Sequence, residues 1–317
     1  MEKYKVSVFT CVYNRAHTMH RVFESMKSQT YQNLEHIIVD DGSTDQLDEL
    51  VENYIKEVDF PVIYLKKKNG GKHTATNVAW DNATGDFIVQ LDSDDELLPH
   101  AISFLVSTYE QIPDEQKQEY WCVHGRCMDQ IERKLVGDLY PENINTLPVE
   151  KAKAVARNTS GEKLGLMKGE TLVGRRYPTP KFVNFVTEGY LWGPLNKQYR
   201  TWYTNEIVRV YYIDEGECLS APRKARQTYN NKVYYYRYAL ENNEQLCVKG
   251  KRLLKMLCLY IVLRFYTTKE FRKEYPYLLR NCGMWLNALL CLLFFDIYCD
   301  EKQIFAGTLI LEYCDKI

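Results

Sequence analysis

Apolar runs rich in β-branched residues alternate with segments of helical spacing over the N-terminal part of this chain. Strands that alternate with helices form βαβ units, and the strands of such units lie parallel. The pattern therefore predicts an α/β fold, a Rossmann-like and mostly parallel sheet flanked by helices. The predicted strands are 5–12, 34–39, 61–65 and 86–91, and the predicted helices between them are 16–29, 46–58 and 74–83.

Polar side chains follow each of these predicted strands. Ligands of open α/β sheets bind beyond the carboxyl ends of the strands. We therefore expect the polar clusters to meet in one site, although each of them alone is an ordinary loop sequence. The clusters are Tyr13-Asn14, Asp40-Asp41, 69–73 and 92–95.

The last cluster crowds Asp92, Asp94 and Asp95 at the end of an apolar run. Like charges this close repel one another, and the cluster costs stability unless a positive charge lies among them. Mg²⁺ or Mn²⁺ is favoured where one or two carboxylates meet substrate phosphates. A solvated acidic turn is the alternative, and a D-x-D triplet taken alone does not separate the two.

Composition argues against some other classes of protein. The net charge of −1 gives no overall field for nucleic acid. The 10 cysteines include no C-x-x-C pair and fit no common zinc spacing, so we expect reduced thiols and a cytoplasmic location. The N-terminus leads directly into a strand and lacks the apolar region of a signal peptide.

Five blocks of sequence, taken together, resemble the family-2 inverting glycosyltransferases of the GT-A fold. They keep the order and spacing of that family, although each block alone has low specificity. Residues 69–75 look like a bacterial subset that builds surface polysaccharides, and the chain after Pro99 resembles the family only in outline. The blocks are 6–15 (VSVFTCVYNR), 28–31 (SQTY), 38–45 (IVDDGSTD), 77–85 and 92–95 (DSDD).

The resemblance implies an enzyme that transfers a hexose or N-acetylhexosamine with inversion from a nucleotide-sugar donor, expected to be UDP-linked. The acceptor would be a saccharide or lipid-linked saccharide in surface polysaccharide biosynthesis, and Mn²⁺ or Mg²⁺ would be the cofactor. The alternative is a nucleotide-sugar-binding protein without transferase activity, which would keep Tyr13 and Asp41 but lack a usable base. A nucleotidyltransferase would be expected to have a glycine-rich loop after the first strand, and residues 11–15 contain no glycine.

The resemblance also assigns roles in the donor site. Tyr13 matches the base-stacking position, where a flat ring can cover one face of uracil. Asp41 matches the carboxylate that accepts the uracil N–H, whereas Asp40 is expected to bond the backbone of its own loop. The glycines of 69–73 let backbone N–H groups approach a ligand, and Lys72 would lie near the ribose or diphosphate. The full expected nucleotide site is Tyr13, Asn14, Asp41, Asn69, Lys72, Asp92 and Ser93.

The same resemblance assigns the metal and the base. Asp94 matches the residue that binds the metal most directly, and Asp92 matches the first carboxylate, which touches the ribose or the metal through water. An inverting transfer needs a base for the acceptor hydroxyl. Glu188, at the start of a predicted helix over 188–198, is our candidate, and Trp192 would stack on an acceptor sugar or fill the core. The rival bases are Glu162, Glu215 and Glu217.

We expect a catalytic domain over 1–227 and a helical extension over 228–317. Within the domain, 1–98 would bind the nucleotide sugar and 99–227 the acceptor, with a hairpin formed by 121–128 and 134–138. The apolar pieces 253–265 and 284–298 are shorter than the ~20 residues that span a bilayer. Either the extension lies peripherally on the inner face of the membrane, or it packs on the catalytic domain or on the second subunit of a homodimer.

Overall fold

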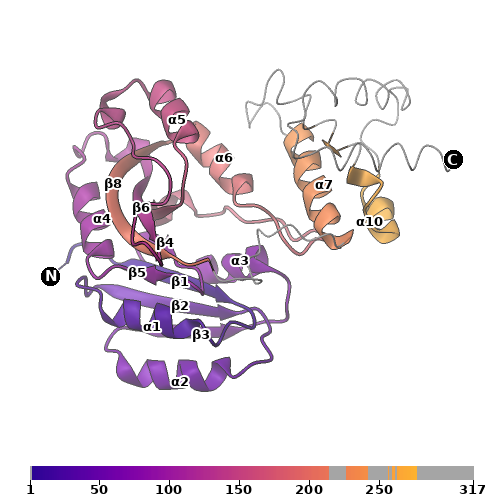
Figure 1. Cartoon of the computed structure of the whole chain (residues 1–317), viewed down its shortest axis with the longest axis horizontal. Coiled ribbons are helices and arrows are strands. Elements are labelled where there is room, and N and C mark those ends of the chain that lie inside the picture. Colours follow the sequence, from indigo (N-terminus) through magenta and orange to yellow (C-terminus); the bar gives the residue numbers. More distant parts are fainter. Residues whose placement is uncertain (1, 214–225, 242–255, 257–258, 261–262, 277–317) are drawn as a thin grey trace. The chain divides into compact units, whose positions relative to one another are not determined.

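A computed structural model describes residues 2–213, 226–241, 256, 259–260 and 263–276 of the chain (Figure 1). The chain forms two compact units, one of residues 1–179 and 185–222 and the other of 180–184 and 223–317. The finer division at residues 98 and 227 stays a prediction.

The first unit is built on one eight-stranded sheet with strand order β3-β2-β1-β4-β7-β6-β8-β5. The strands β3, β2, β1 and β4 run parallel, as the alternating pattern predicts. Strand β7 runs antiparallel to both β4 and β6, and β5 runs antiparallel to β8. The α/β, Rossmann-like class is confirmed, and the second half of the sheet is mixed. The strands are β1 (Val6–Val12), β2 (Leu34–Asp40), β3 (Val62–Lys66), β4 (Phe87–Gln90), β5 (Glu96–Leu97), β6 (Tyr120–Asp129), β7 (Lys163–Lys168) and β8 (Arg200–Tyr211).

Helices cover both faces of this sheet. Side chains alternate along a strand, so Val6 and Val8 of β1 enter the core under α1, α2 and α4. Phe9 enters the core on the opposite face, with residues of α3 and α6. The helices are α1 (Met19–Lys27), α2 (Leu47–Glu57), α3 (Lys72–Asn82), α4 (Ala101–Glu110), α5 (Val149–Asn158) and α6 (Gly189–Gln198), with single 3₁₀ turns at Lys117–Glu119, Ile144–Thr146 and Gly169–Thr171.

The predicted hairpin of 121–128 and 134–138 forms only at its closed end. Met128 and Leu135 share an antiparallel bridge, with hydrogen bonds from the Asp129 N–H to the Lys134 carbonyl and from the Val136 N–H to the Cys127 carbonyl, both at 2.9 Å. Before that point β6 pairs through Cys122–Arg126 with β7 instead, and with β8 on its other side. Three segments thus supply the backbone partners of β6.

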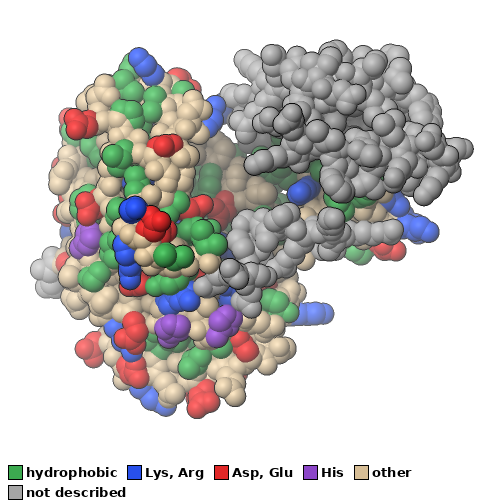
Figure 2. All heavy atoms as spheres, in the orientation of Figure 1, with side chains coloured by type: hydrophobic (Ala, Val, Ile, Leu, Met, Phe, Trp, Pro, Cys, Tyr) green, Lys and Arg blue, Asp and Glu red, His purple; other side chains and the backbone are tan. Residues whose placement is uncertain are grey.

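In Figure 2, basic and acidic side chains are interspersed with apolar ones over the visible face of the first unit. This distribution agrees with the nearly balanced totals of 41 Lys and Arg against 42 Asp and Glu. The charged side chains visible on this face are therefore of both signs.

The described part of the second unit contains α7 (Arg226–Glu241) and α10 (Lys269–Glu274). Thr268 caps α10, because its hydroxyl accepts a hydrogen bond from the Phe271 N–H at 3.2 Å. The apolar pieces 253–265 and 284–298 lie largely outside the described residues. Within the described ranges, no helix combines the length and the apolar character that crossing a bilayer requires.

Candidate active site

The loops that follow β1 and β2 are joined at Asn14. Its backbone adopts a left-handed conformation with φ of 51°, which asparagine tolerates better than most residues. Its side-chain oxygen accepts the Thr44 N–H at 2.8 Å, and its own N–H donates to the Ser43 hydroxyl at 3.0 Å. Asp40 accepts the Ser43 N–H at 2.7 Å, in the backbone role expected of it. Beside these fixed loops the ring of Tyr13 is 49% exposed, so one of its faces is open to a ligand.

Asp41 joins the loop after β2 to the loop after β3. Its carboxylate is almost fully buried, accepts the N–H groups of Gly70 at 3.0 Å and Gly71 at 2.7 Å, and pairs with Lys67. Gly42 makes this approach of the loops feasible, because its φ is +83° and a Cβ there would lie 2.8 Å from the Asn69 nitrogen. The side chain expected to read the base therefore also shapes the glycine loop.

Lys72, at the start of α3, holds two distant carboxylates together. Its Nζ donates to Asp92 Oδ1 at 2.8 Å and lies 3.6 Å from Glu188 Oε1. The amide of Gln90 donates to the same two oxygens, at 3.3 and 3.1 Å. Glu188, the predicted base, therefore lies beside the acidic cluster.

Charge attraction decides the protonation of this pair. Burial would raise the pKa of Asp92, but the Lys72 ammonium group lowers that pKa to about 2. Burial would also lower the pKa of Lys72, and the attraction of Asp92 and Glu188 raises it above its ordinary value. Both groups are thus charged at neutral pH, and they form an ion pair.

The other two aspartates of the cluster meet arginines. Asp94 Oδ2 accepts a hydrogen bond from Arg15 at 2.9 Å, and burial and the nearby Asp92 charge raise the pKa of Asp94. Asp95 is fully buried, lies 3.1 Å from the Arg209 guanidinium and accepts the Tyr212 N–H at 3.0 Å. Asp95 thus fixes the acidic loop to β8, while Asp92 and Asp94 remain partly exposed.

The donor chemistry of Asp92 and Asp94 fits a divalent cation. Both supply hard carboxylate oxygens, the ligand type that Mn²⁺ and Mg²⁺ prefer. In the described ranges no three or more His, Cys, Asp or Glu side chains are grouped around a metal position. The predicted metal ligands are therefore these two aspartates alone, and their oxygens already meet the cationic groups of Lys72 and Arg15.

A cavity of about 260 Å³ opens beside Asp92 and Glu188. Glu188 is the N-cap residue of α6, and Trp192 follows one turn later on the same helix. Trp192 also packs on Trp121, with ring centroids 5.3 Å apart, so it belongs to both the core and the cavity wall. The lining residues are Gln90, Asp92, Trp121, Cys122, His124, Glu162, Lys163, Leu164, Gly165, Met167, Glu188, Trp192, Asn196 and Arg209.

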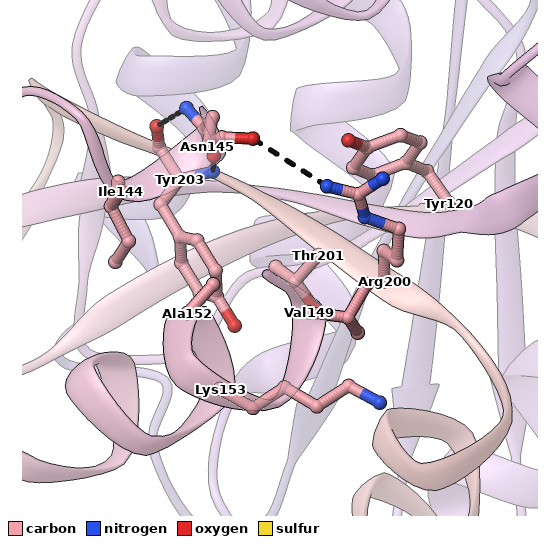
Figure 3. A pocket seen from close by; sticks show the side chains of 9 residues that line it. All are labelled: Tyr120, Ile144, Asn145, Val149, Ala152, Lys153, Arg200, Thr201 and Tyr203. Carbon is pink, nitrogen blue, oxygen red and sulfur yellow. Dashed lines mark hydrogen bonds between the residues drawn. The ribbon is translucent and has the colours of Figure 1, made fainter. Parts of the chain in front are cut away.

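A second hollow, at the start of β8, is too small for a substrate (Figure 3). Its free volume is about 10 Å³, which is about the space of one water molecule. Asn145 exchanges two hydrogen bonds with the Tyr203 backbone, at 2.8 and 3.0 Å, and Arg200 lies over the Tyr120 ring. These contacts pack β8 against the segment before α5 and form no substrate site.

The structure brings some of the predicted site residues together. Asp92, Glu188 and Trp192 line the cavity and Lys72 contacts the first two, whereas the side chain of Asn69 is exposed in its loop. Ser93 contributes its backbone, because its carbonyl oxygen accepts a hydrogen bond from the Thr18 hydroxyl at 2.7 Å. Of the rival bases, Glu162 also lines the cavity, while Glu215 and Glu217 lie outside the described residues.

Four cationic or amide side chains of the site could not be predicted from the sequence, because nothing in it distinguishes them from their neighbours. Lys67 stands in a run of three lysines, of which Lys66 pairs with Asp48 on the surface. The others are long side chains that contact a residue of another element, and spacing within their own element does not indicate that contact. The four are Arg15, Lys67, Gln90 and Arg209.

Comparison with known proteins agrees with this geometry. Residues 7–116 match the family model "Glycosyl transferase family 2". The chain is 26% identical over 291 residues to the GalNAc(5)-diNAcBac-PP-undecaprenol beta-1,3-glucosyltransferase of Campylobacter jejuni, a match that covers 90% of each chain. An uncharacterized glycosyltransferase of Rickettsia felis is 34% identical over 149 residues, which are 46% of this chain and 24% of that protein.

Solved structures show the same fold. S. aureus TarS 1–349 in complex with UDP-GlcNAc has a TM-score of 0.56 at 19% identity, over 91% of this chain and 80% of that one. The mannosyltransferase PcManGT from Pyrobaculum calidifontis, in complex with GDP-Man and Mn²⁺, has a TM-score of 0.52 at 16% identity, over 99% of this chain and 81% of that one. The expected resemblance is thus confirmed over the N-terminal part: residues 7–116 form a family-2 glycosyltransferase domain, and the solved structures show the GT-A fold.

Proposed function

We propose that the chain transfers a sugar, with inversion, from a UDP-linked donor to a saccharide or lipid-linked saccharide during synthesis of a surface polysaccharide. One observation carries this proposal: Asp92 and Glu188 are bridged by Lys72 and Gln90 at one cavity. The Campylobacter relative is named for a saccharide linked to undecaprenol, and this supports a lipid-linked acceptor. The UDP-GlcNAc bound by TarS supports a UDP-linked donor.

In this proposal the nucleoside lies over the loops after β1 and β2. The exposed face of Tyr13 stacks on the base, and Asp41 accepts its N–H with a lone pair that the glycine amides leave free. Asn14 holds the two loops together, and the exposed side chain of Asn69 is a further proposed contact to the nucleotide. Asp92 and Ser93 then face the ribose.

Asp94 and Asp92 would hold Mn²⁺ or Mg²⁺, a choice supported by the Mn²⁺ in PcManGT. Such an ion would neutralise the charge that develops on the departing nucleoside diphosphate. Lys72 contributes a further positive charge, because its Nζ can move from Asp92 to a phosphate oxygen.

Glu188 is the proposed base. Its side chain is 46% exposed, so an acceptor hydroxyl can reach the carboxylate from the cavity. The carboxylate takes the hydroxyl proton while the oxygen attacks the anomeric carbon on the face opposite the leaving group. Trp192, which follows on the same face of α6, offers its ring to the acceptor sugar.

Release of UDP from a panel of UDP-sugars, with and without Mn²⁺, tests the proposal. We expect turnover in the wild type that requires the ion and is lost in Asp94→Ala. The matched control is Asp81→Ala, which removes a surface aspartate paired with Arg176 away from the site and should leave turnover unchanged. A protein that binds UDP tightly yet consumes none of the sugar nucleotides with any acceptor would be a binding protein, contrary to this proposal.

A further inference from the structure

The inner end of the cavity, beyond Asp92 and Glu188, is built from two paired strands and one helix. Cys122 of β6 lies opposite Met167 of β7, and His124 lies opposite Gly165. Asn196 of α6 completes the wall. We propose that this end binds the acetamido group of a 2-acetamido pyranose, an inference that rests on the proposed function and narrows its substrate.

Asn196 lines the cavity, and two donors set the orientation of its amide. Its Oδ1 accepts the Trp121 indole N–H at 3.1 Å and the Thr201 hydroxyl at 3.2 Å. An indole nitrogen can only donate, so the atom that it meets must be the amide oxygen. The NH₂ group therefore points away from Trp121, and no hydrogen bond ties it to the described part of the chain.

His124 supplies another donor. Burial lowers the pKa of His124 to about 4, so the ring is neutral at pH 7 and carries one N–H. Its Nδ1 is enclosed and has no hydrogen-bond partner among residues the structure describes. Nε2 faces Gly165, which lines the cavity, and it lies 3.7 Å from the position that a Cβ on Gly165 would take. A ligand can therefore reach Nε2 and not the enclosed Nδ1, and the tautomer with its proton on Nε2 offers a donor to that ligand.

The space between these donors is small and partly apolar. A Cβ on Gly165 would lie 2.8 Å from Cys122 Sγ, so the glycine keeps the floor open. Cys122, Met167 and Trp121 provide a wall that suits a methyl group. The 260 Å³ is below the roughly 300–1,000 Å³ of pockets for drug-sized ligands, which indicates about one sugar ring.

The charged groups at the wall already have partners. Lys72 faces Asp92 and Glu188, Arg209 faces Asp95 and Glu162, and Lys163 donates to the carbonyls of Thr159 and Gly161. A uronic acid carboxylate would have to displace one of these contacts to find a cation, whereas a neutral substituent would not. A hydroxyl would leave the apolar wall uncovered, whereas an acetamido group offers a carbonyl oxygen to the donors and a methyl to the wall.

The acetamido ring can belong to the donor or to the acceptor, since both Asp92 and Glu188 border the cavity. Two experiments distinguish these sources. In the donor arm, calorimetry with Mn²⁺ compares UDP-GlcNAc and UDP-GalNAc with UDP-glucose and UDP-galactose. In the acceptor arm, saturation-transfer NMR on the UDP-saturated protein compares p-nitrophenyl glycosides of the acetamido sugars with those of glucose and galactose. We expect a preference of at least about tenfold for the acetamido sugar in one arm, and that arm identifies the source.

Asn196→Asp tests the assigned contact in that arm. The change keeps an oxygen for Trp121 and Thr201 but removes the NH₂ donors, so the preference should fall to within about twofold while affinity for UDP is kept. Gln198→Glu makes the same amide-to-carboxylate change two positions later on α6, at an exposed side chain, and should keep the preference. His124→Phe removes the second donor independently and should also reduce it.

Equal affinities in both arms, or a preference that survives in both Asn196→Asp and His124→Phe, would overturn the inference and leave the transferase proposal standing. Absence of any UDP binding by the wild type would instead overturn the proposed function itself, and this inference with it.

Discussion

Replacing Glu188 by glutamine separates a catalytic role from a structural one. A positioned general base contributes about 10²–10⁴ in rate, so kcat should fall by that factor when the carboxylate becomes an amide. This loss corresponds to about 3–5 kcal/mol of activation free energy. The amide oxygen still accepts the Gln90 N–H, which lies at 3.1 Å in the wild type, so the side chain should stay in place.

The stability effect of the same change should be much smaller. Glu188 is 46% exposed and its oxygen lies 3.6 Å from Lys72, which makes the pair a weak, partly solvated ion pair. Such pairs contribute about 0–1 kcal/mol. The melting temperature and the affinity for UDP should therefore stay close to those of the wild type, while kcat falls far more than either of them.

Steady-state kinetics, calorimetry with UDP and thermal unfolding of Glu188→Gln would check this difference. Glu162→Gln is the matched comparison, because Glu162 lines the same cavity, is 48% exposed and lies 3.5 Å from Arg209. If Glu162→Gln loses turnover and Glu188→Gln keeps it within tenfold, the base is Glu162 and our assignment is wrong.

Three further predictions concern the loops and the core. Tyr13→Ala should weaken every UDP-sugar and UDP itself equally, by about 1–3 kcal/mol as measured by calorimetry, since the lost contact is to the base. Gly42→Ala should destabilise the protein by about 1–3 kcal/mol in urea unfolding and weaken UDP, because φ is +83° and the new Cβ would press on the Asn69 nitrogen. Burial lowers the pKa of His36 to about 3, so below pH 6.5 the folded state binds fewer protons than the unfolded state. The contribution of His36 to the free energy of unfolding is complete above pH 6.5 and should fall by about 2 kcal/mol by pH 5. In His36→Gln the free energy of unfolding should depend less on pH over this range.

The parallel half of the sheet could be predicted because each of its strands is a separate apolar run followed by a polar cluster. Strand β7 could not, because its sequence KLGLMK combines a glycine with a lysine at each end. The structure explains this composition. Gly165 leaves the cavity floor open, and Lys163 and Lys168 donate to carbonyls at either end of the strand. The local hairpin predicted for β6 therefore holds only around Met128 and Leu135, and β7 is the neighbour of β6 before that point.

The acidic residues of the site could be predicted from the sequence, but of the cations that neutralise them only Lys72 could. A D-x-D cluster implies a need for positive charge, and a metal ion is one way to meet it. The structure meets the same need with side chains from other elements, one for each carboxylate. Lys67 pairs with Asp41, Lys72 with Asp92, Arg15 with Asp94 and Arg209 with Asp95.

This pairing bears on how the site accepts a charged substrate. A buried carboxylate left without a partner is strongly destabilising, so the acidic loop can be stable only while some cation faces it. A divalent ion and a diphosphate that bind together bring nearly equal and opposite charges. Arg15 and Lys72 can then exchange Asp94 and Asp92 for phosphate oxygens, and no charge is left unpaired. Arg209 is only 5% exposed and Asp95 is fully buried, so that pair should keep its contact and hold the loop in place during the exchange.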